Sequence, residues 1–96
     1  MVVHIVMFKF KEENKEANIE AVVVRLNALV ALVPSLISME VGVNFTNSDR
    51  AFDLSLYSTF ETKEELEAYA IHPEHLKVVE FIKSVTLESK VVDYIL

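Results

Sequence analysis

Three histidines and one tyrosine are the residues of this chain best suited to chemistry. His72 and His75 flank Pro73 about one helical turn apart, Tyr69 precedes His72 by three residues, and His4 stands near the start. A histidine with a pKa near 6.5 exchanges protons at neutral pH, and a tyrosine hydroxyl can hydrogen-bond a carbonyl or enolate. An interruption of the helix at Pro73 can aim Tyr69 and His75 into one pocket between helix and sheet.

Two other interpretations of these residues stay open. In the first, His72 caps a restarted helix, His75 lies on the helix surface, and Tyr69 is a core aromatic residue with its hydroxyl at the edge. In the second, the His-x-x-His pair holds zinc, with His4 as a third ligand. The chain has no cysteine to complete such a zinc site.

Composition excludes several classes of function. With one glycine, Gly42, the chain has no glycine-rich phosphate loop, dinucleotide fingerprint or serine nucleophile elbow, so we expect no nucleotide cofactor. A net charge of −6 without a basic stripe argues against nucleic acid. No apolar run approaches the roughly 20 residues of a membrane span, and the start lacks a signal-peptide pattern. We therefore expect a cytoplasmic protein that binds neither membrane nor nucleic acid.

The first strand is expected over residues 2 to 10, and both of its faces are apolar. Val2, Val6 and Phe8 alternate with Val3 and Ile5. In an α+β sheet with helices on one face, the other face would meet water. A second subunit is the simplest cover. The high hydrophobic fraction of 52% is consistent with an interface.

Two helical segments are predicted from spacing and end signals. Residues 17 to 33 carry an apolar stripe at three- and four-residue spacing, and Pro34 ends that helix. Thr62 and Glu65 form a capping box for the second segment. Pro73 interrupts the second segment, which restarts through Glu74 to Val85. The residues expected on the buried faces are Ile19, Val22, Leu26, Leu29 and Val33, then Leu66, Tyr69, Ala70, Val78, Val79, Phe81 and Ile82.

Alternating residues predict three more strands, at 36 to 45, 52 to 60 and 86 to 95, with the polar loop TNSDR between the first two. The side chains expected to point inward are Ile37, Met39, Val41, Val43 and Phe45, then Phe52, Leu54, Leu56 and Phe60. The order βαββαβ is the ferredoxin-like arrangement, an antiparallel four-stranded sheet with its helices on one face. Without linker, repeat or composition shift, residues 1 to 96 are expected to form a single domain.

The end of the first helix is a candidate cation site. The carbonyls around Val30, Val33 and Leu36 lack intrahelical partners there, and the negative end of the helix dipole favours a cation. Water or a lysine could satisfy the same oxygens.

Three segments of the chain resemble the stress-responsive dimeric A/B barrel family. They are His4-Ile5-Val6-Met7-Phe8-Lys9-Phe10-Lys11, Leu32-Val33-Pro34, and Tyr69-Ala70-Ile71-His72-Pro73-Glu74-His75 followed by Val78, Val79 and Phe81. The resemblance spans essentially the whole chain. It implies a homodimer in which two ferredoxin-like sheets build a dimeric α/β barrel with the helices outside, in agreement with the doubly apolar first strand.

The resemblance also implies roles for individual residues. In a polyketide cyclase of this family, the histidine matching His75 is the base and the tyrosine matching Tyr69 assists, while His4 matches a first-strand histidine. Leu26 departs from the cyclase, which has a pocket-lining tyrosine there. Some plant members look to bind magnesium through main-chain carbonyls, which would fall at Val30, Val33 and Leu36. We expect no other cofactor, and we expect a ligand to contact His72, Phe8, Leu26 and Phe81.

The sequence is therefore consistent with three functions. The first is a homodimeric stress-responsive protein that binds a small apolar or aromatic molecule in a pocket between helices and sheet, without turnover. The second is a cofactor-free, polyketide-cyclase-like enzyme in which His75 removes a proton next to a carbonyl and Tyr69 stabilises the oxyanion. The third, a cofactor-free monooxygenase, rests on analogy of fold alone.

Overall fold

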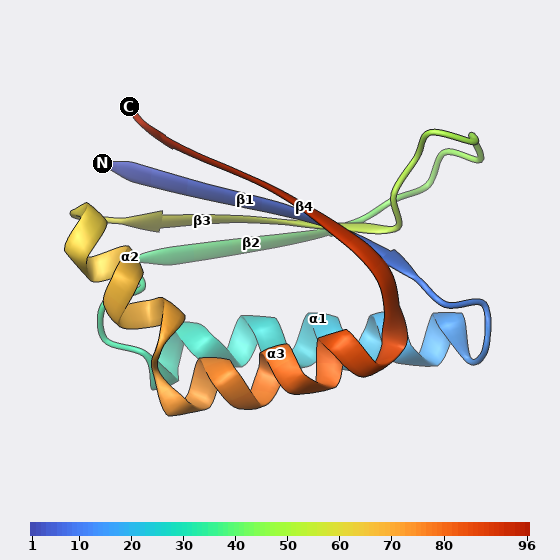
Figure 1. The fold of residues 1–96 in the computed structure, drawn as a ribbon, viewed down its shortest axis with the longest axis horizontal. Coiled ribbons are helices and arrows are strands. Elements are labelled where there is room, and N and C mark those ends of the chain that lie inside the picture. The colour runs from blue at the N-terminus through green and yellow to red at the C-terminus, as the bar shows by residue number, and fades with distance from the viewer.

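A four-stranded antiparallel sheet with three helices on one of its faces makes up the computed structural model, which describes residues 1–96 (Figure 1). This is the predicted ferredoxin-like fold, with the second helical segment divided in two. Its elements, in chain order, are β1 (Val2–Phe10), α1 (Lys15–Leu32), β2 (Ser38–Val43), β3 (Leu54–Phe60), α2 (Lys63–Ala70), α3 (Pro73–Val85) and β4 (Thr86–Ile95). None of the helices is long and apolar enough to cross a membrane.

The sheet has the strand order β2-β3-β1-β4, which places β1 in its interior. Residues paired directly across antiparallel strands share a face of the sheet. His4 of β1 pairs with Ser58 of β3 and with Asp93 of β4, so these three side chains belong to one face. Phe8 and Val6 follow His4 on that face, which is the one that the helices cover. The register therefore lines up His4, Val6 and Phe8 beneath the helices.

The helices end where the sequence signals predict. Pro34 has no N–H to continue α1, and the Val33 N–H closes the helix on the Leu29 carbonyl at 2.9 Å. Thr62 caps α2 by accepting from the Glu65 N–H at 3.2 Å. His72 is the N-cap of α3, and Pro73 occupies its first turn. The break between α2 and α3 gives the two helices different directions (Figure 1).

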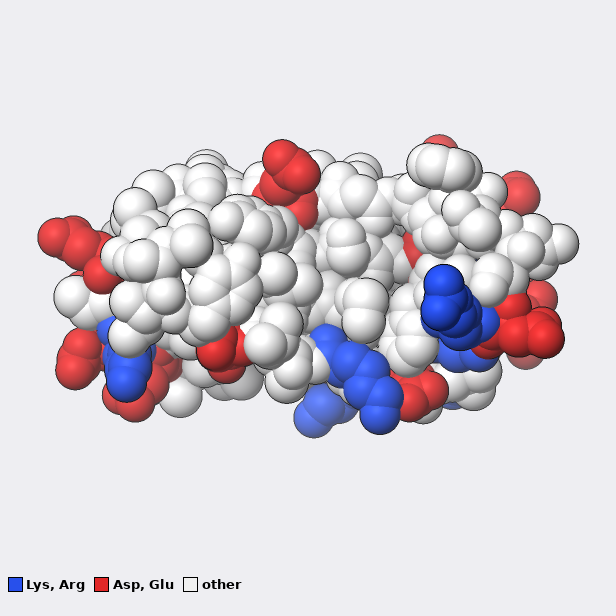
Figure 2. Space-filling view, turned by 90° about the horizontal axis from the view of Figure 1, so that it is seen from above, with Lys and Arg blue, Asp and Glu red and all other residues white.

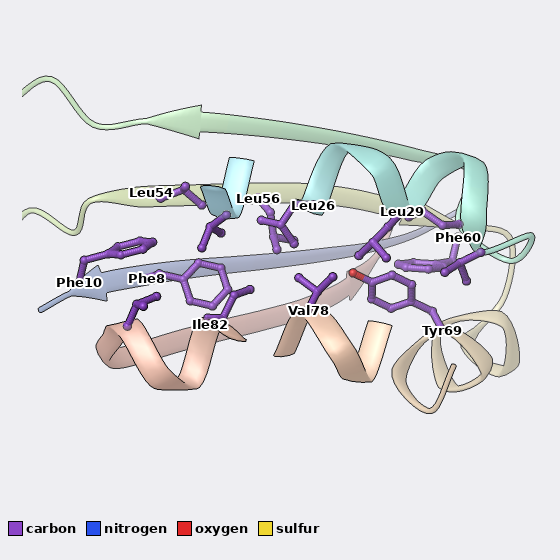
Figure 3. Packing of buried hydrophobic residues seen from close by; sticks show 14 of the residues in the cluster. Phe8, Phe10, Leu26, Leu29, Leu54, Leu56, Phe60, Tyr69, Val78 and Ile82 are labelled. Carbon is purple, nitrogen blue, oxygen red and sulfur yellow. The ribbon is translucent and has the colours of Figure 1, made fainter. Parts of the chain in front are cut away.

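The core lies between the helices and the sheet. Leu26 and Leu29 of α1 are each 1% exposed and face Phe60 and Leu56 of β3 across it (Figure 3). Tyr69 closes one end of this layer, and its hydroxyl points back toward Val78 of α3 (Figure 3). Burying side chains of this size contributes about 1.5–3 kcal/mol each, so the stripe of α1 holds the helix on the sheet.

The opposite face of the sheet carries no helix. Met7, Tyr57, Val92 and Tyr94 lie on this open face and are between 37% and 53% exposed, and Ile5 beside them is partly buried. Figure 2 looks onto this side of the molecule, where charged side chains gather mainly toward the margins and uncharged atoms fill the centre. The predicted division of β1 into a helix-covered face and a second apolar face is therefore present.

Four residues predicted to point inward are exposed instead. Ile37 and Val43 lie at the two ends of β2, an edge strand that covers less of the core than predicted. Phe45 follows the end of β2 in the connecting loop and is 98% exposed. Ala70 ends the short helix α2, whose single buried residue is Tyr69. The prediction failed at Ile37 and Phe45 because the alternating pattern continues past the ends of β2, and it failed at Val43 and Ala70 because each is the last residue of its element.

Candidate functional site

The two ends of the helix break bring Tyr69 and His75 together. Tyr69 comes from the last turn of α2, and His75 from the first turn of α3. Their ring centroids are 4.1 Å apart. The His4 ring of β1 lies 6.4 Å from the Tyr69 ring, centroid to centroid. The three predicted catalytic residues therefore meet at one place between helices and sheet, although His4 is 65 or more residues from the other two.

These residues line a cavity of about 210 Å³. Eight of its thirteen lining residues are hydrophobic. For comparison, an apolar cavity of about 150 Å³ in a protein core holds one benzene molecule. The space therefore fits a single ring with a few substituents. The lining residues are His4, Val6, Phe8, Leu26, Leu56, Tyr69, His75, Val78, Val79, Ile82, Lys83, Thr86 and Ser89.

His75 is held in the state that a general base needs. Its Nδ1 lies 3.1 Å from the Ala70 carbonyl, which can only accept, so Nδ1 carries the proton in this bond. The other ring nitrogen, Nε2, then has a free lone pair in the neutral form. Burial lowers the pKa of His75 below 6.5; the bond to Ala70 opposes this shift, and the nearby His4 and His72 add to it. His75 is therefore neutral and able to accept a proton at pH 7.

Tyr69 supplies a hydrogen-bond donor beside that base. The residue is 1% exposed, and its ring packs against Phe60 with centroids 5.1 Å apart. Burial raises the pKa of the Tyr69 hydroxyl well above its ordinary value of 10.0. The hydroxyl therefore keeps its proton at neutral pH and can donate it to a carbonyl oxygen or an enolate.

His4 has a carboxylate partner that the sequence reasoning missed. Its Nδ1 lies 2.5 Å from Asp93 Oδ1, across the pairing of β1 with β4. A carboxylate accepting at Nδ1 fixes the imidazole tautomer and its orientation. The signal that could have found it is the single acid in the otherwise apolar run Val91-Val92-Asp93-Tyr94-Ile95. Asp93 thus joins the candidate site through His4.

Comparison with known proteins gives the family. The model of the stress responsive A/B barrel domain matches residues 2–96. The chain belongs to this family. Among its relatives in Arabidopsis thaliana are two stress-response A/B barrel domain-containing proteins. One is 38% identical over 76 residues, which are 79% of this chain and 29% of that protein. The other is 34% identical over 98 residues, which are 99% of this chain and 47% of that protein. This A/B barrel domain therefore spans less than half the length of either relative.

A third relative has a length close to that of this chain. It is olivetolic acid cyclase from Cannabis sativa, which is 28% identical over 93 residues, or 95% of this chain and 92% of the cyclase. Among solved structures, a dimeric ferredoxin-like protein of unknown function from Bacteroides fragilis is 30% identical with a TM-score of 0.87, covering 97% and 93% of the two chains. Hydroxynitrile lyase from Passiflora edulis has a TM-score of 0.88 at 21% identity, covering 99% and 92%. At that identity, the likeness to the lyase concerns the fold alone.

Two residues expected to contact a ligand do not line the cavity of this A/B barrel domain. The Nδ1 of His72 accepts from the Glu74 N–H at 3.1 Å, so its ring serves as the cap of α3. The Arg25 guanidinium of α1 lies over the Phe81 ring of α3, with its central carbon 4.1 Å from the ring centroid. Phe8 and Leu26 do line the cavity. The face of a helix was predictable from the sequence; the position of Phe81 at the edge of that face was not.

The metal alternatives fit the structure poorly. No group of three or more histidine, aspartate or glutamate side chains converges as metal ligands, and the cap uses His72, so the His4-His72-His75 zinc site does not form. At the end of α1, the Val33 carbonyl already accepts from the Leu36 N–H at 3.1 Å. Val30 lacks a partner four residues on because Pro34 has no N–H. The carbonyls of Val30, Val33 and Leu36 are therefore not a free set of three, and magnesium stays a prediction.

Proposed function

We propose that this A/B barrel domain binds a small apolar or aromatic carbonyl compound and that His75 transfers a proton on it without a cofactor. The observation that carries the proposal is the arrangement of His75, whose Nδ1 is bonded to Ala70 while its ring lies against Tyr69 in the cavity. A neutral imidazole beside a protonated phenol is a base next to an oxyanion donor. The 28% identity to a cyclase over nearly the whole length of both chains supports the same chemistry.

The proposed step is proton abstraction next to the carbonyl. The lone pair of His75 Nε2 takes a proton from the α-carbon, and the electron pair of the broken C–H bond forms the carbon–carbon double bond of an enolate. The carbonyl electrons move onto oxygen, where the Tyr69 hydroxyl donates a hydrogen bond. The enolate is then free to attack a second carbonyl of the same molecule or to take the proton back from His75.

Binding without turnover is the second candidate. The mostly apolar lining favours it, because an apolar ring transferred from water into such a cavity gains roughly 25 cal/mol per Å² of buried surface without any reaction. A cofactor-free monooxygenase is less well supported. A structure described as an antibiotic biosynthesis monooxygenase shares the fold with a TM-score of 0.78 at 12% identity, and that likeness concerns the fold alone.

We further propose that the open face of the sheet is covered by a second copy of this chain, which would complete a dimeric α/β barrel. The exposed apolar side chains of Met7, Tyr57, Val92 and Tyr94 support this, because an apolar face in contact with water is unfavourable. The solved relative from Bacteroides fragilis is described as dimeric. A location in the cytoplasm stays a prediction. The absence of nucleic-acid partners also stays a prediction, and the net charge of −6 favours it.

The test of the proton transfer uses butyrophenone, a neutral aryl ketone with exchangeable α-protons. Exchange of these protons in deuterium oxide is followed by proton NMR, and binding is measured from the ligand line width in the same samples. We expect the protein to accelerate exchange and His75→Gln to lose about 10²-fold or more of that acceleration while still binding the ketone. Binding without acceleration supports the second candidate. If the ketone does not bind and its exchange is not accelerated, both candidate functions are contradicted.

A further inference from the structure

The cavity beside Tyr69 and His75 carries a single formally charged group, which is Lys83. The chain has 15 acidic residues and a net charge of −6, yet no aspartate or glutamate lines this cavity. Lys83 takes part in none of the ion pairs of the chain, whereas Lys77 on the same helix pairs with Glu74 at 3.3 Å. A cation without a carboxylate partner in an otherwise uncharged cavity is available to an anionic group of a ligand.

Lys83 also marks one end of the cavity. It follows His75 by eight residues on α3, a separation of about 12 Å along the helix axis. Tyr69 at the inner end is 1% exposed, whereas Lys83 and Ser89 at the other end are exposed. The cavity therefore runs from the buried Tyr69, with the half-buried His75 beside it, to an exposed outer end with the cation.

This difference in exposure determines how a ligand would lie. An isolated carboxylate is costly to bury, so the carboxylate of an amphipathic ligand would stay at the exposed outer end, and its apolar part would enter toward Leu26 and Leu56. The Ser89 and Thr86 hydroxyls border the cavity with Lys83, and Thr86 Oγ1 donates to the Ile82 carbonyl at 2.8 Å. Thr86 therefore has no hydroxyl proton left for a ligand. One lysine beside the Ser89 hydroxyl suits a monoanion such as a carboxylate.

We infer that Lys83 selects the ligand class of this cavity: carbonyl compounds with an apolar or aromatic middle and a carboxylate at the end remote from the reacting carbonyl. The inference rests on the proposed function of the same cavity and adds an anionic group to its ligand. Lys83 touches the ligand through that group alone and takes no part in the proton transfer. A pair at this exposed position favours the anion by about fivefold.

Lys83 also has a structural role in α3, which the experiment must distinguish from ligand selection. It lies in the last turn of α3, where a positive charge also stabilises the helix dipole. That role affects the stability of the helix and leaves the choice between a charged and a neutral ligand unchanged. The test therefore measures a ratio of affinities.

The probes are ω-benzoylpentanoate and its primary amide, which have the same length and the same aryl ketone. Their dissociation constants are measured by NMR titration at low salt for the wild type, Lys83→Gln, Lys83→Arg and the control Lys77→Gln. We expect the wild type, Lys83→Arg and Lys77→Gln to prefer the carboxylate about fivefold, and Lys83→Gln to show no preference.

Equal affinity of the two probes in the wild type would overturn the inference, as would a preference that survives in Lys83→Gln or failure of both probes to bind. Butyrophenone separates this result from the proposed function. If butyrophenone binds and exchanges its α-protons while the two probes are not distinguished, only the role of Lys83 is lost. If butyrophenone fails as well, the proposed function fails with it.

Discussion

The rings of Tyr69 and His75 lie 4.1 Å apart between centroids and are inclined by 40°. In an unbroken helix, residues six apart are rotated by about 240° from one another and face different directions. The pair meets because α2 ends at Ala70, with Ile71 as its C-cap, and Pro73 starts α3 in a new direction. The helix break at Pro73 therefore places the candidate base, His75, against the candidate donor, Tyr69.

Replacing Tyr69 by phenylalanine removes the donor and keeps the ring. We expect Tyr69→Phe to lower the protein-dependent α-proton exchange of butyrophenone about 10²–10³-fold, because the enolate oxygen loses its hydrogen bond. The stacking on His75 and Phe60 should persist, so the midpoint of urea unfolding should change little. Tyr57→Phe on the open face is the matched control. Equal exchange rates in Tyr69→Phe and the wild type would contradict this role of the hydroxyl.

Asp93→Asn tests how His4 is held. The carboxylate keeps the proton of His4 on Nδ1, whereas an asparagine can offer either an acceptor or a donor there. Nitrogen NMR should show one His4 tautomer in the wild type and a mixture in Asp93→Asn. Because Asp93 is 48% exposed, we expect the free energy of unfolding to fall by at most about 1 kcal/mol. A His4 tautomer that is the same in both proteins would show that Asp93 does not orient this ring.

The pKa of His75 predicts how stability depends on pH. Burial lowers this pKa in the folded chain below 6.5, the ordinary value that the unfolded chain retains. In the window between the lowered pKa and 6.5, the unfolded chain therefore binds more protons than the folded chain. The free energy of unfolding should decrease as the pH falls through this window, and the contribution of His75 should be complete above 6.5.

Urea unfolding at a series of pH values measures this dependence. The matched variant is His75→Gln, which has no group titrating there and should show a shallower decrease below pH 6.5. His4 and His72 are present in both proteins, so the difference between the two curves reports His75 and its coupling to these two histidines. Curves that run parallel through the window would mean that folding does not shift the pKa of His75.

The open face of the sheet predicts the oligomeric state. A charge in the centre of an apolar interface is costly to bury, so Val92→Glu should convert a dimer into a monomer. Val24→Glu, on α1, is the control because Val24 is 69% exposed and lies outside the sheet. Sedimentation equilibrium at micromolar concentration should give a dimer for the wild type and for the control. A monomeric wild type would refute the second copy as the cover of this face.

Much of the fold was predictable because local signals specify it. Pro34 and Pro73 mark helix boundaries by removing an N–H, and Thr62 marks a start by accepting one. The apolar run around Asp93 singles out that residue, but its contact with His4 was not predictable, since the two are 89 residues apart and meet through the register of β1 with β4. Phe81 packs against the core as predicted but does not line the cavity. Its spacing fits the apolar face of α3, but α1 takes up that edge through Arg25.

A crystal structure of the protein with butyrophenone bound tests the central claim most directly. We predict the carbonyl oxygen within hydrogen-bonding distance of the Tyr69 hydroxyl, with the α-carbon facing Nε2 of His75. The phenyl ring should lie among Leu26, Leu56 and Val78. The competing location is the wider groove along the outer side of α1, lined by Ile19, Val23 and Val43, which contains neither histidine nor tyrosine. A ketone bound only in that groove, with the cavity closed by its own side chains, would contradict the account.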